Sequence, residues 1–459
     1  MCIILFTIFL LVKSLIFLLI IYNKIITLLK FGYKIYKIYK ILKNLFCQPF
    51  KKMNRKIPFI KKSQKLKNVC YDVRGPVLEK AKELENKGEK IIKLNIGNPF
   101  AFGFETPSEI LKEVKINLSK YQGYTDAKGI PEARQAILES YKKKNIKNIS
   151  IEDIYIGNGV SELILMSIQA LLNNKDEVLI PQPDYPLWSA AVSLSGGKSV
   201  FYHCDEKQEW LPDIKDIKRK ITSKTKAIVI INPNNPTGAL WPKETLEKII
   251  KIAKEKNLVV LADEIYDEII YEKEKHFPIA SLSNDLLFLT FGGLSKNYYF
   301  PGIRSGWLLV SGNKKIAKDY IEGLNILSNM RLCSNIAGQM AIKPALEKRH
   351  RILKKHKEEL KKQRDLAYKL INQIPGLSST RPKAAFYIFP KIDIKKFNIK
   401  DDEKFVLDFL LKEKILLVAG KGFNWPKPDH FRIVFLPKKK ILLFALQKLK
   451  KFLDTYKQY

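Results

Sequence analysis

The sequence predicts an α/β fold in which a mainly parallel sheet lies between two layers of helices and a smaller α+β domain follows. From about residue 90, short apolar runs alternate with stretches of helical periodicity, a pattern typical of parallel sheets. The apolar runs are nearly continuous, as expected for strands that are covered on both faces. After about residue 335 the pattern changes to a long charged helix and shorter strands, which predicts the second domain.

The individual elements follow from these patterns. In the first part we expect strands over residues 177–180, 227–231, 258–262, 286–291 and 307–311, with helices over 161–172, 243–256 and 315–327. In the second part we expect a helix over 342–374, strands over 385–389, 415–419 and 430–435, and a final helix near 438–456. The predicted division is an N-terminal arm with part of the small domain (53–106), a large domain (107–335) and a small C-terminal domain (336–459).

Residues 1–52 differ from the rest of the chain in composition. Residues 3–22 form an apolar run interrupted by one lysine and two hydroxyl residues, and about 20 apolar residues can span a bilayer as a helix. Two interpretations stay open: a membrane anchor with a basic flank, or a misassigned start upstream of Met53. We favour the second, because hydropathy reports the ability to span a membrane and not its use. We therefore expect a cytoplasmic protein, tethered to a membrane if residues 3–22 are translated.

Charge and cysteine content exclude several other classes. The formal net charge is +36, and residues 1–67 carry fifteen Lys and Arg with no acidic residue. No nucleic-acid recognition motif accompanies the charge, so we expect a solvated basic surface and no nucleic-acid partner. The five cysteines form no CxxC pair and show no metal-ligand spacing, which predicts free thiols in a reducing compartment and no metal site.

Polar motifs follow several of the predicted strands. They are GNGVSE at 157–162, NPNNPTG at 232–238, DEIY at 263–266 and GGLSK at 292–296. Ligands of an open parallel sheet bind beyond the carboxyl ends of its strands, so these motifs are expected to converge on one site. The first motif opens a predicted helix, whose amides and dipole favour an anion. Arg304 stands eight residues after Lys296 and adds a permanent positive charge.

These motifs together, in this order and with a late FR pair at 431–432, resemble the class I/II aminotransferases of pyridoxal-phosphate fold type I. The resemblance extends over residues 68–459. It implies pyridoxal 5'-phosphate as the cofactor, a three-layer αβα large domain and amino-group transfer. Longer stretches such as PDYPLWSAAVSLSGGK and SNMRLCSN are most similar to the bacterial alanine aminotransferases. That similarity implies the reaction L-alanine + 2-oxoglutarate = pyruvate + L-glutamate, in alanine biosynthesis.

The resemblance also implies a role for each motif residue. Lys296 is expected to bond covalently with the cofactor aldehyde and to act as the base that moves the proton at the substrate Cα. Asp263 is expected to pair with the protonated pyridine nitrogen and to keep the ring cationic. Asn235 and Tyr266 are expected to hydrogen-bond the phenolic oxygen, and Tyr185 to stack on the ring.

A second group of residues is implied to hold the cofactor phosphate: Gly159, Val160, Ser161, Ser295 and Arg304. The sequence departs from many relatives at position 293, which is glycine where a second serine is common. One phosphate contact is therefore expected to be missing or replaced. Tyr124 matches a residue that reaches the phosphate of the neighbouring subunit, which implies a homodimer with shared active sites.

The amino-acid and 2-oxo-acid substrates need contacts of their own. Arg432 is implied to clamp the substrate α-carboxylate together with Asn235, and Gly97 would let the backbone approach that carboxylate closely. The distal carboxylate of glutamate requires a further cation. Our hypothesis is Arg74, with Tyr71 beside it, in a segment that folds over the site in related enzymes.

Two alternatives stay open at this point. One is another reaction on the same scaffold, such as aspartate or aromatic transamination or a C–S lyase, because the cofactor residues are shared. The other is a transcription regulator that senses the cofactor. Such a protein needs a DNA-binding segment before the aminotransferase-like domain, and residues 1–67 contain no helix-turn-helix pattern.

Overall fold

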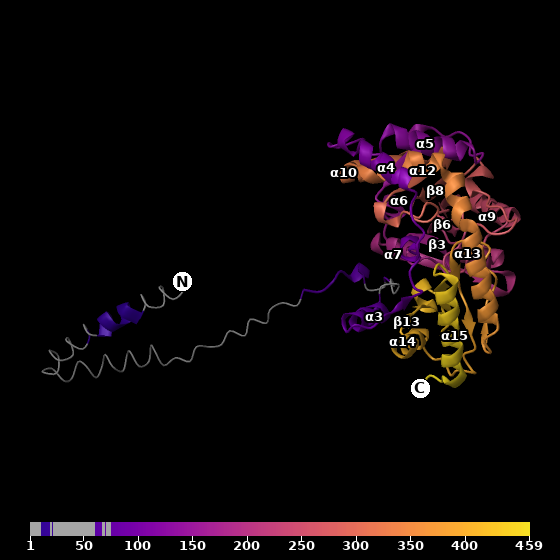
Figure 1. Cartoon of the computed structure of the whole chain (residues 1–459). Coiled ribbons are helices and arrows are strands. Elements are labelled where there is room, and N and C mark those ends of the chain that lie inside the picture. Colours follow the sequence, from indigo (N-terminus) through magenta and orange to yellow (C-terminus); the bar gives the residue numbers. More distant parts are fainter. Residues whose placement is uncertain (1–10, 19–20, 22–59, 67–68, 70–74) are drawn as a thin grey trace. The chain divides into compact units, whose positions relative to one another are not determined.

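The computed structural model describes residues 11–18, 21, 60–66, 69 and 75–459 (Figure 1). The chain divides into two units, residues 1–62 and 63–459. In the first unit, residues 11–18 are helical and exposed. Within the described residues, no helix is both long enough and apolar enough to cross a bilayer. Most of the apolar run over 3–22, like the start predicted at Met53, lies outside the described residues.

Eight strands form the central sheet of the second unit, in the order β2-β9-β8-β7-β6-β3-β4-β5. Their bounds are β2 Ile154–Gly157, β3 Glu177–Gln182, β4 Lys198–Asp205, β5 Leu211–Pro212, β6 Thr225–Ile231, β7 Val259–Asp263, β8 Leu287–Gly293 and β9 Gly306–Gly312. The neighbours from β4 through β3, β6 and β7 to β8 pair in parallel. The predicted mainly parallel sheet is therefore confirmed.

One predicted strand, 307–311, runs against its neighbours. It is β9, which lies antiparallel between β8 and β2. The reason is the connection from β8, which carries no α-helix and only the 3₁₀ turn Pro301–Ile303. A parallel crossover usually needs an intervening helix, so this short connection returns the chain in the opposite direction.

Helices cover both faces of the sheet. They are α5 Pro131–Lys142, α6 Val160–Leu171, α7 Leu187–Leu194, α8 Ile214–Lys220, α9 Lys243–Glu255 and α10 Lys318–Arg331. Alternate side chains of β6 belong to two apolar clusters, because successive strand residues point to opposite faces. Val229 and Ile231 join Leu163 of α6, whereas Ile228 and Ile230 join Leu246 of α9. This arrangement is the three-layer αβα architecture that the sequence predicts.

The C-terminal part contains a smaller antiparallel sheet of β11 (Tyr387–Ile388), β15 (Phe431–Val434) and β14 (Val418–Ala419). Helices α13 (Arg349–Asn372) and α15 (Lys439–Thr455) lie side by side near it (Figure 1). The predicted single helix over 342–374 is wrong. It is divided into α12 (Ile342–Glu347) and α13, because α12 packs on α5 and α13 packs on α15.

Elements from the start of the second unit pack with this C-terminal part. Helix α3 (Pro76–Asn86) contacts α14 (Asp402–Glu413). Strand β1 (Ile92–Lys93) pairs in parallel with β13 (Ile415–Leu416). The remaining pieces are α4 (Ser108–Asn117), α11 (Ile336–Met340) and the antiparallel pair β10 (Leu377–Ser378) and β12 (Lys391–Ile392). The residues after β1 thereby reach the carboxyl edge of the central sheet, where Gly97 meets Lys296.

Candidate active site

A cavity of about 300 Å³ lies at the carboxyl ends of the central strands. Its wall includes most of the predicted site residues: Gly97, Val160, Ser161, Tyr185, Asn235, Asp263, Tyr266, Ser295, Lys296, Arg304 and Arg432. The strand order explains this convergence, since β6, β7 and β8 are neighbours and each ends at or just before one of these motifs. Sequence motifs separated along the chain are thus brought to one edge of the sheet.

Lys296 follows β8 by three residues and points into this cavity. Its Nζ donates a hydrogen bond of 2.8 Å to the carbonyl oxygen of Gly97. That carbonyl belongs to the segment after β1, which packs with the C-terminal part of the chain. The lysine therefore joins the central sheet to the opposite wall of the cavity.

Asp263 is the last residue of β7 and is only 3% exposed. The indole Nε1 of Trp188 donates to its Oδ2 over 3.2 Å, and the amide of Ile265 donates to its Oδ1 over 3.4 Å. Burial raises the pKa of this carboxyl group to about 6, while the two hydrogen bonds and the charge of Lys296 act in the opposite direction. A cation brought next to the carboxylate would favour its charged form.

The turn before α6 is open to an anion. Gly159 is the N-cap of that helix and has a φ of +86°, in the left-handed region that favours glycine. A Cβ atom there would lie 2.3 Å from Nη2 of Arg304, so a side chain would displace the guanidinium. The same Nη2 donates to Ser161 Oγ over 3.2 Å. Backbone amides, a hydroxyl and a fixed cation therefore meet at one helix start.

The glycine at position 293 has a structural reason. It is the last residue of β8 and pairs with Gly306 of β9. A Cβ atom there would lie 3.0 Å from the carbonyl oxygen of Ser305 and 3.1 Å from the Cα of Gly306. A serine would therefore require the paired strand to shift. Ser295, two residues on, lies in the cavity wall.

Arg432 is a buried cation on β15. Its Nη1 donates to Asn235 Oδ1 over 2.8 Å, and its Nη2 donates to the carbonyl oxygen of Asn95. The guanidinium lies between two rings, with its Cζ 4.5 Å from the centroid of Tyr387 and 4.6 Å from that of Phe423. Burial lowers the pKa of this group and neighbouring tyrosines raise it. A carboxylate that enters the cavity would meet a rigid, oriented donor.

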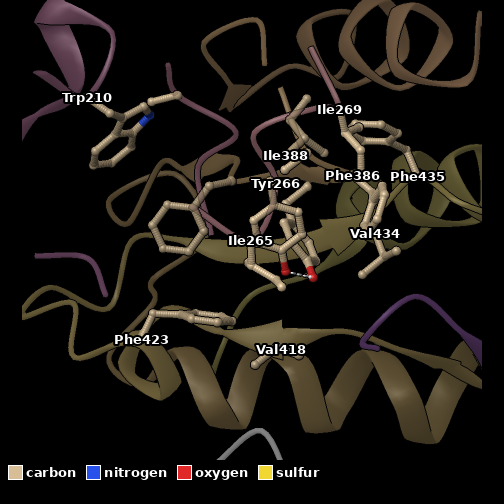
Figure 2. Close-up of a cluster of buried hydrophobic side chains, with 14 of the residues drawn as sticks. Trp210, Ile265, Tyr266, Ile269, Phe386, Ile388, Val418, Phe423, Val434 and Phe435 are labelled. Carbon is tan, nitrogen blue, oxygen red and sulfur yellow. Dashed lines mark hydrogen bonds between the residues drawn. The ribbon is translucent and has the colours of Figure 1, made fainter. Parts of the chain in front are cut away.

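Two tyrosine hydroxyls meet beside this arginine. Figure 2 shows Tyr266 in its apolar surroundings, with a dashed hydrogen bond from its hydroxyl. The partner is the hydroxyl of Tyr387, 2.8 Å away. Burial raises the pKa of Tyr266 well above its ordinary value, and the Tyr387 hydroxyl adds to this effect. A Cβ atom at Gly97 would lie 2.2 Å from the Tyr387 hydroxyl oxygen, so glycine is required for this close approach.

The remaining predicted residues lie elsewhere. Tyr124 is 84% exposed and is not part of the cavity wall. Tyr71 and Arg74 lie outside the described residues. Of the described residues that line the cavity, the cations are Lys296, Arg304 and Arg432.

Several residues of the cavity wall were not predicted from the sequence. The apolar wall comes from Leu78, Ile96, Ile164, Leu187, Ile231, Ile265 and Pro301. Tyr387 also lines the cavity, and Trp188 contacts Asp263 from behind. Trp188 belongs to the PDYPLW motif and could have been predicted from it. Tyr387 stands in an ordinary strand, where no motif marks it as a site residue.

Outside the cavity, Glu264, Asp267 and His276 are the one group of the described residues with metal-ligand geometry. The ammonium group of Lys144 is bonded to Asp267 and lies 3.6 Å from Glu268. It already supplies the positive charge that this acidic cluster needs. The cluster therefore gives no argument for a metal ion.

The cavity residues fit pyridoxal phosphate. A lysine faces the cavity, a buried carboxylate lies on its wall, and an arginine stands at the open start of α6. Gly159 has no side chain of its own, and this lets the Arg304 guanidinium lie against the turn that begins α6, where it can bind an anion. A dianionic phosphate, a cationic ring nitrogen and an aldehyde each find a residue of suitable chemistry.

Comparison with known proteins gives the same result. A sequence profile for "Aminotransferase class I and II" matches residues 89–445. The chain is 56% identical over 401 residues to the glutamate-pyruvate aminotransferase AlaA of Escherichia coli K12, which covers 87% of this chain and 99% of that protein. It is 50% identical to an alanine aminotransferase of Mycobacterium tuberculosis, over 86% of this chain and 93% of that protein.

Solved structures agree in fold. An aminotransferase from Escherichia coli aligns with a TM-score of 0.85 at 55% identity, covering 87% of this chain and 100% of that one. An alanine aminotransferase from Pyrococcus furiosus aligns with a TM-score of 0.82 at 41% identity, covering 86% and 100%. The predicted fold class is confirmed, as is the dependence on pyridoxal phosphate that the family implies. The chain belongs to the class I and II aminotransferases.

Proposed function

We propose that the enzyme transfers the amino group between L-alanine and 2-oxoglutarate, giving pyruvate and L-glutamate, in alanine biosynthesis. The names of relatives at 56% and 50% identity support this pair of substrates. The observation that carries the proposal is the buried Arg432, held by Asn235 on the same cavity wall as Lys296 and Asp263. This arrangement suits a ligand with a carboxylate at one end and an amino group at the other.

Each wall residue has a task in this proposal. Pyridoxal phosphate, when bound, supplies an aldehyde for the amino group and a ring that withdraws electrons from the substrate Cα. Lys296 Nζ takes the proton from the Cα of the donor amino acid. It returns a proton to the Cα of the acceptor when the new amino acid forms. Arg432 holds the α-carboxylate, so that the Cα–H bond is presented to the lysine. Asp263 holds a proton on the ring nitrogen by its negative charge.

Other residues keep the cofactor in place while Lys296 is free to act as a base. Arg304, Ser161 and the amides that begin α6 bind the phosphate. Tyr266 and Tyr185 both line the cavity, where Tyr266 would donate to the phenolic oxygen and Tyr185 would cover the ring. Substrate binding through Arg432 and cofactor binding through Arg304 thus use separate cations.

The proposal can be tested with the absorbance spectrum of the pure, cofactor-loaded protein. Addition of L-alanine should shift the cofactor band and release one equivalent of pyruvate per site. Addition of 2-oxoglutarate should then restore the original band. L-Aspartate, L-tyrosine and a thioether amino acid serve as comparison donors. A larger absorbance change with L-aspartate or L-tyrosine than with L-alanine would show that the enzyme is an aspartate or aromatic aminotransferase. Release of a thiol from the thioether amino acid would show that it is a C–S lyase.

The distal carboxylate of glutamate needs a cation that the described wall does not offer beyond Lys296, Arg304 and Arg432. We propose Arg74 for this task, with Tyr71 beside it. Arg74→Ala is expected to raise the KM for glutamate and for 2-oxoglutarate about 10-fold, because it removes a charge-assisted hydrogen bond. The KM for alanine, which has no distal carboxylate, should change less than 2-fold. Equal effects on alanine and glutamate, or none on either, would exclude this role.

We also propose that two copies of the chain share their active sites. Tyr124 is 84% exposed, and Phe100 and Leu111 are 65% and 45% exposed in a mainly apolar hollow beside Lys296. Large exposed apolar side chains around a site are typical of an interface. In this arrangement Tyr124 would reach the phosphate of the other copy.

Subunit hybrids test the sharing. Tyr124→Ala should lower activity about 10-fold by removing a phosphate hydrogen bond, and Lys296→Ala should remove activity. Randomly mixed, the two variants should regain roughly a quarter of the wild-type rate. Half of the dimers are then hybrids, and each hybrid has one complete site of two. A mixture no more active than the average of its parents would show that each site is made by one chain.

Two further assignments belong to this proposal. We assign residues 107–335 to a cofactor-binding lobe, and 336–459 with 53–106 to a smaller lobe, supported by the pairing of β1 with β13. We assign the enzyme to the cytoplasm, supported by the free thiols of Cys204 and Cys333, which suit a reducing compartment. A membrane tether would depend on residues 3–22, most of which lie outside the described part of the chain.

A further inference from the structure

Tyr387 stands between the two ends of the candidate site. It begins β11, is 2% exposed, and lines the cavity. Its ring lies under the guanidinium of Arg432, 4.5 Å from Cζ to the ring centroid. Its hydroxyl lies 2.8 Å from the hydroxyl of Tyr266. One side chain therefore contacts both the residue assigned to the substrate carboxylate and a residue assigned to the cofactor.

The hydroxyl pair has a direction once the cofactor is bound. Each phenol carries one proton to donate, and its oxygen can accept. If Tyr266 donates its proton to the phenolic oxygen of the cofactor, the bond between the two tyrosines needs a donor from the other side. That donor is Tyr387. The result is a chain of two hydrogen bonds, in which the first strengthens the second in a buried environment.

The ring of Tyr387 has a separate task. The guanidinium of Arg432 lies between the faces of Tyr387 and Phe423, so its plane is fixed before a carboxylate arrives. Stacking on an aromatic face and two donated hydrogen bonds leave the arginine one orientation. Removing the ring would free that plane, whereas removing the hydroxyl alone would leave it intact.

We propose that Tyr387 is a positioning residue with two functions: its hydroxyl orders and polarises the Tyr266 hydroxyl, and its ring orients Arg432. This inference rests on the proposed function, since it assumes that Tyr266 serves the cofactor and Arg432 the substrate. It adds a physical link between the carboxylate end of the site and the cofactor end. The alternative is that Tyr387 only fills space in the apolar cluster, where its ring lies against those of Tyr266 and Phe386.

The hydroxyl function predicts a spectroscopic effect. A donor on the phenolic oxygen draws off part of its negative charge and weakens its attraction for the proton shared with the neighbouring nitrogen. Losing the Tyr387 hydroxyl makes Tyr266 a poorer donor, so that attraction grows. The pKa of the pH-dependent absorbance change of the loaded enzyme should therefore rise in Tyr387→Phe, by about 0.5 unit. Tyr266→Phe should shift the same pKa in the same direction and further.

The ring function predicts a kinetic effect of a different kind. Tyr387→Leu removes both hydroxyl and ring, and should raise the KM for alanine and for glutamate about 10-fold through the disordered arginine. Tyr387→Phe retains the ring and should raise these KM values far less. The two functions are separate if Tyr387→Phe changes mainly the absorbance pKa, whereas Tyr387→Leu changes both that pKa and the KM values. If the leucine variant does not fold, the phenylalanine variant still tests the hydroxyl.

Tyr271 provides a matched control. It is fully buried, and its hydroxyl donates to the carbonyl oxygen of Ala385 over 2.6 Å, two residues before Tyr387. Tyr271→Phe loses a buried hydroxyl and its hydrogen bond in the same region, away from the cavity wall. It should leave the absorbance pKa unchanged. A pKa in Tyr387→Phe equal to the wild-type value, or an equal shift in Tyr271→Phe, would overturn the inference.

The proposed substrate and the proposed hydroxyl link can be tested separately. If the wild-type band does not respond to alanine while Tyr387→Phe still shifts its pKa, the proposed substrate is wrong and the hydroxyl link holds. If the wild-type enzyme transaminates alanine and Tyr387→Phe has the wild-type pKa, the substrate holds and the link is wrong.

Discussion

Replacing Lys296 by alanine is expected to abolish transamination and to leave the fold intact. The ammonium group is the only lysine amine on the cavity wall among the described residues, and it lies 2.8 Å from the Gly97 carbonyl. Loss of a positioned base costs roughly 10²- to 10⁴-fold, and loss of the covalent attachment adds to this. We expect a total loss of at least about 10⁴-fold in kcat for alanine and 2-oxoglutarate.

Stability should hardly change in this variant, because the side chain is partly exposed and donates its hydrogen bond to a backbone carbonyl. Thermal unfolding of the cofactor-free protein is the check. Lys315→Ala, which removes an exposed lysine after β9, is the matched control and should keep full activity. Activity above about 1% of wild type in Lys296→Ala would refute the assignment of the base, since general-base catalysis alone is worth more.

The second large effect is expected for Asp263→Asn, which should act on catalysis and stability in opposite directions. Asparagine is nearly the same size and can still accept the hydrogen bond from Trp188, but it carries no charge. Without the negative charge, the ring nitrogen holds its proton less well. A lost electrostatic contact of this type costs about 10²- to 10³-fold in kcat.

The stability effect follows from the sign of the pKa shift. In the folded, cofactor-free protein, burial raises the pKa of Asp263 from its ordinary 3.8 to about 6. A raised carboxyl pKa means that folding favours the protonated form, so stability is greatest below about pH 4 and is lost as the pH rises through 6. The cost of the buried charge above that range is on the order of 3 kcal/mol.

Asp263→Asn should therefore raise the free energy of unfolding of the cofactor-free protein at pH 7.5, and have little effect at pH 4. Denaturant titrations at the two pH values measure this difference. Asp184→Asn is the matched control, because burial also raises the pKa of Asp184, to about 7, and this residue is not in the cavity wall. It should be stabilised in the same way and retain its activity. Equal stability changes at both pH values would contradict the buried-charge explanation.

The sequence predicted the parts of the structure that local patterns determine. Continuous apolar runs identified the strands, and the motifs after them converge because the carboxyl ends of parallel strands share one edge. The direction of β9 and the break between α12 and α13 depend on packing partners, which a local pattern does not contain.

The same distinction holds within the site. Lys296 and Asp263 stand in motifs that end strands. Tyr387 contacts a hydroxyl 121 residues away in the chain, and its position is fixed only when β11 pairs with β15. No spacing in the sequence signals such a pair. Trp188 lies 75 residues from Asp263, and its motif gave the right region but not the contact.

The pairing of β1 with β13 has a consequence for biosynthesis. Ile92 leaves the ribosome about 320 residues before its partner Ile415, a delay of roughly 16 to 65 seconds at 5–20 residues per second. During that time the central sheet can form, but the segment that carries Gly97 has no strand to join. The segment that carries Gly97 and faces Lys296 is therefore synthesised before the central sheet, but it takes its final position only after β13 has been made. A nascent chain that stops short of residue 415 would hold its lysine opposite an unfinished wall, so catalytic competence arrives only near the end of translation.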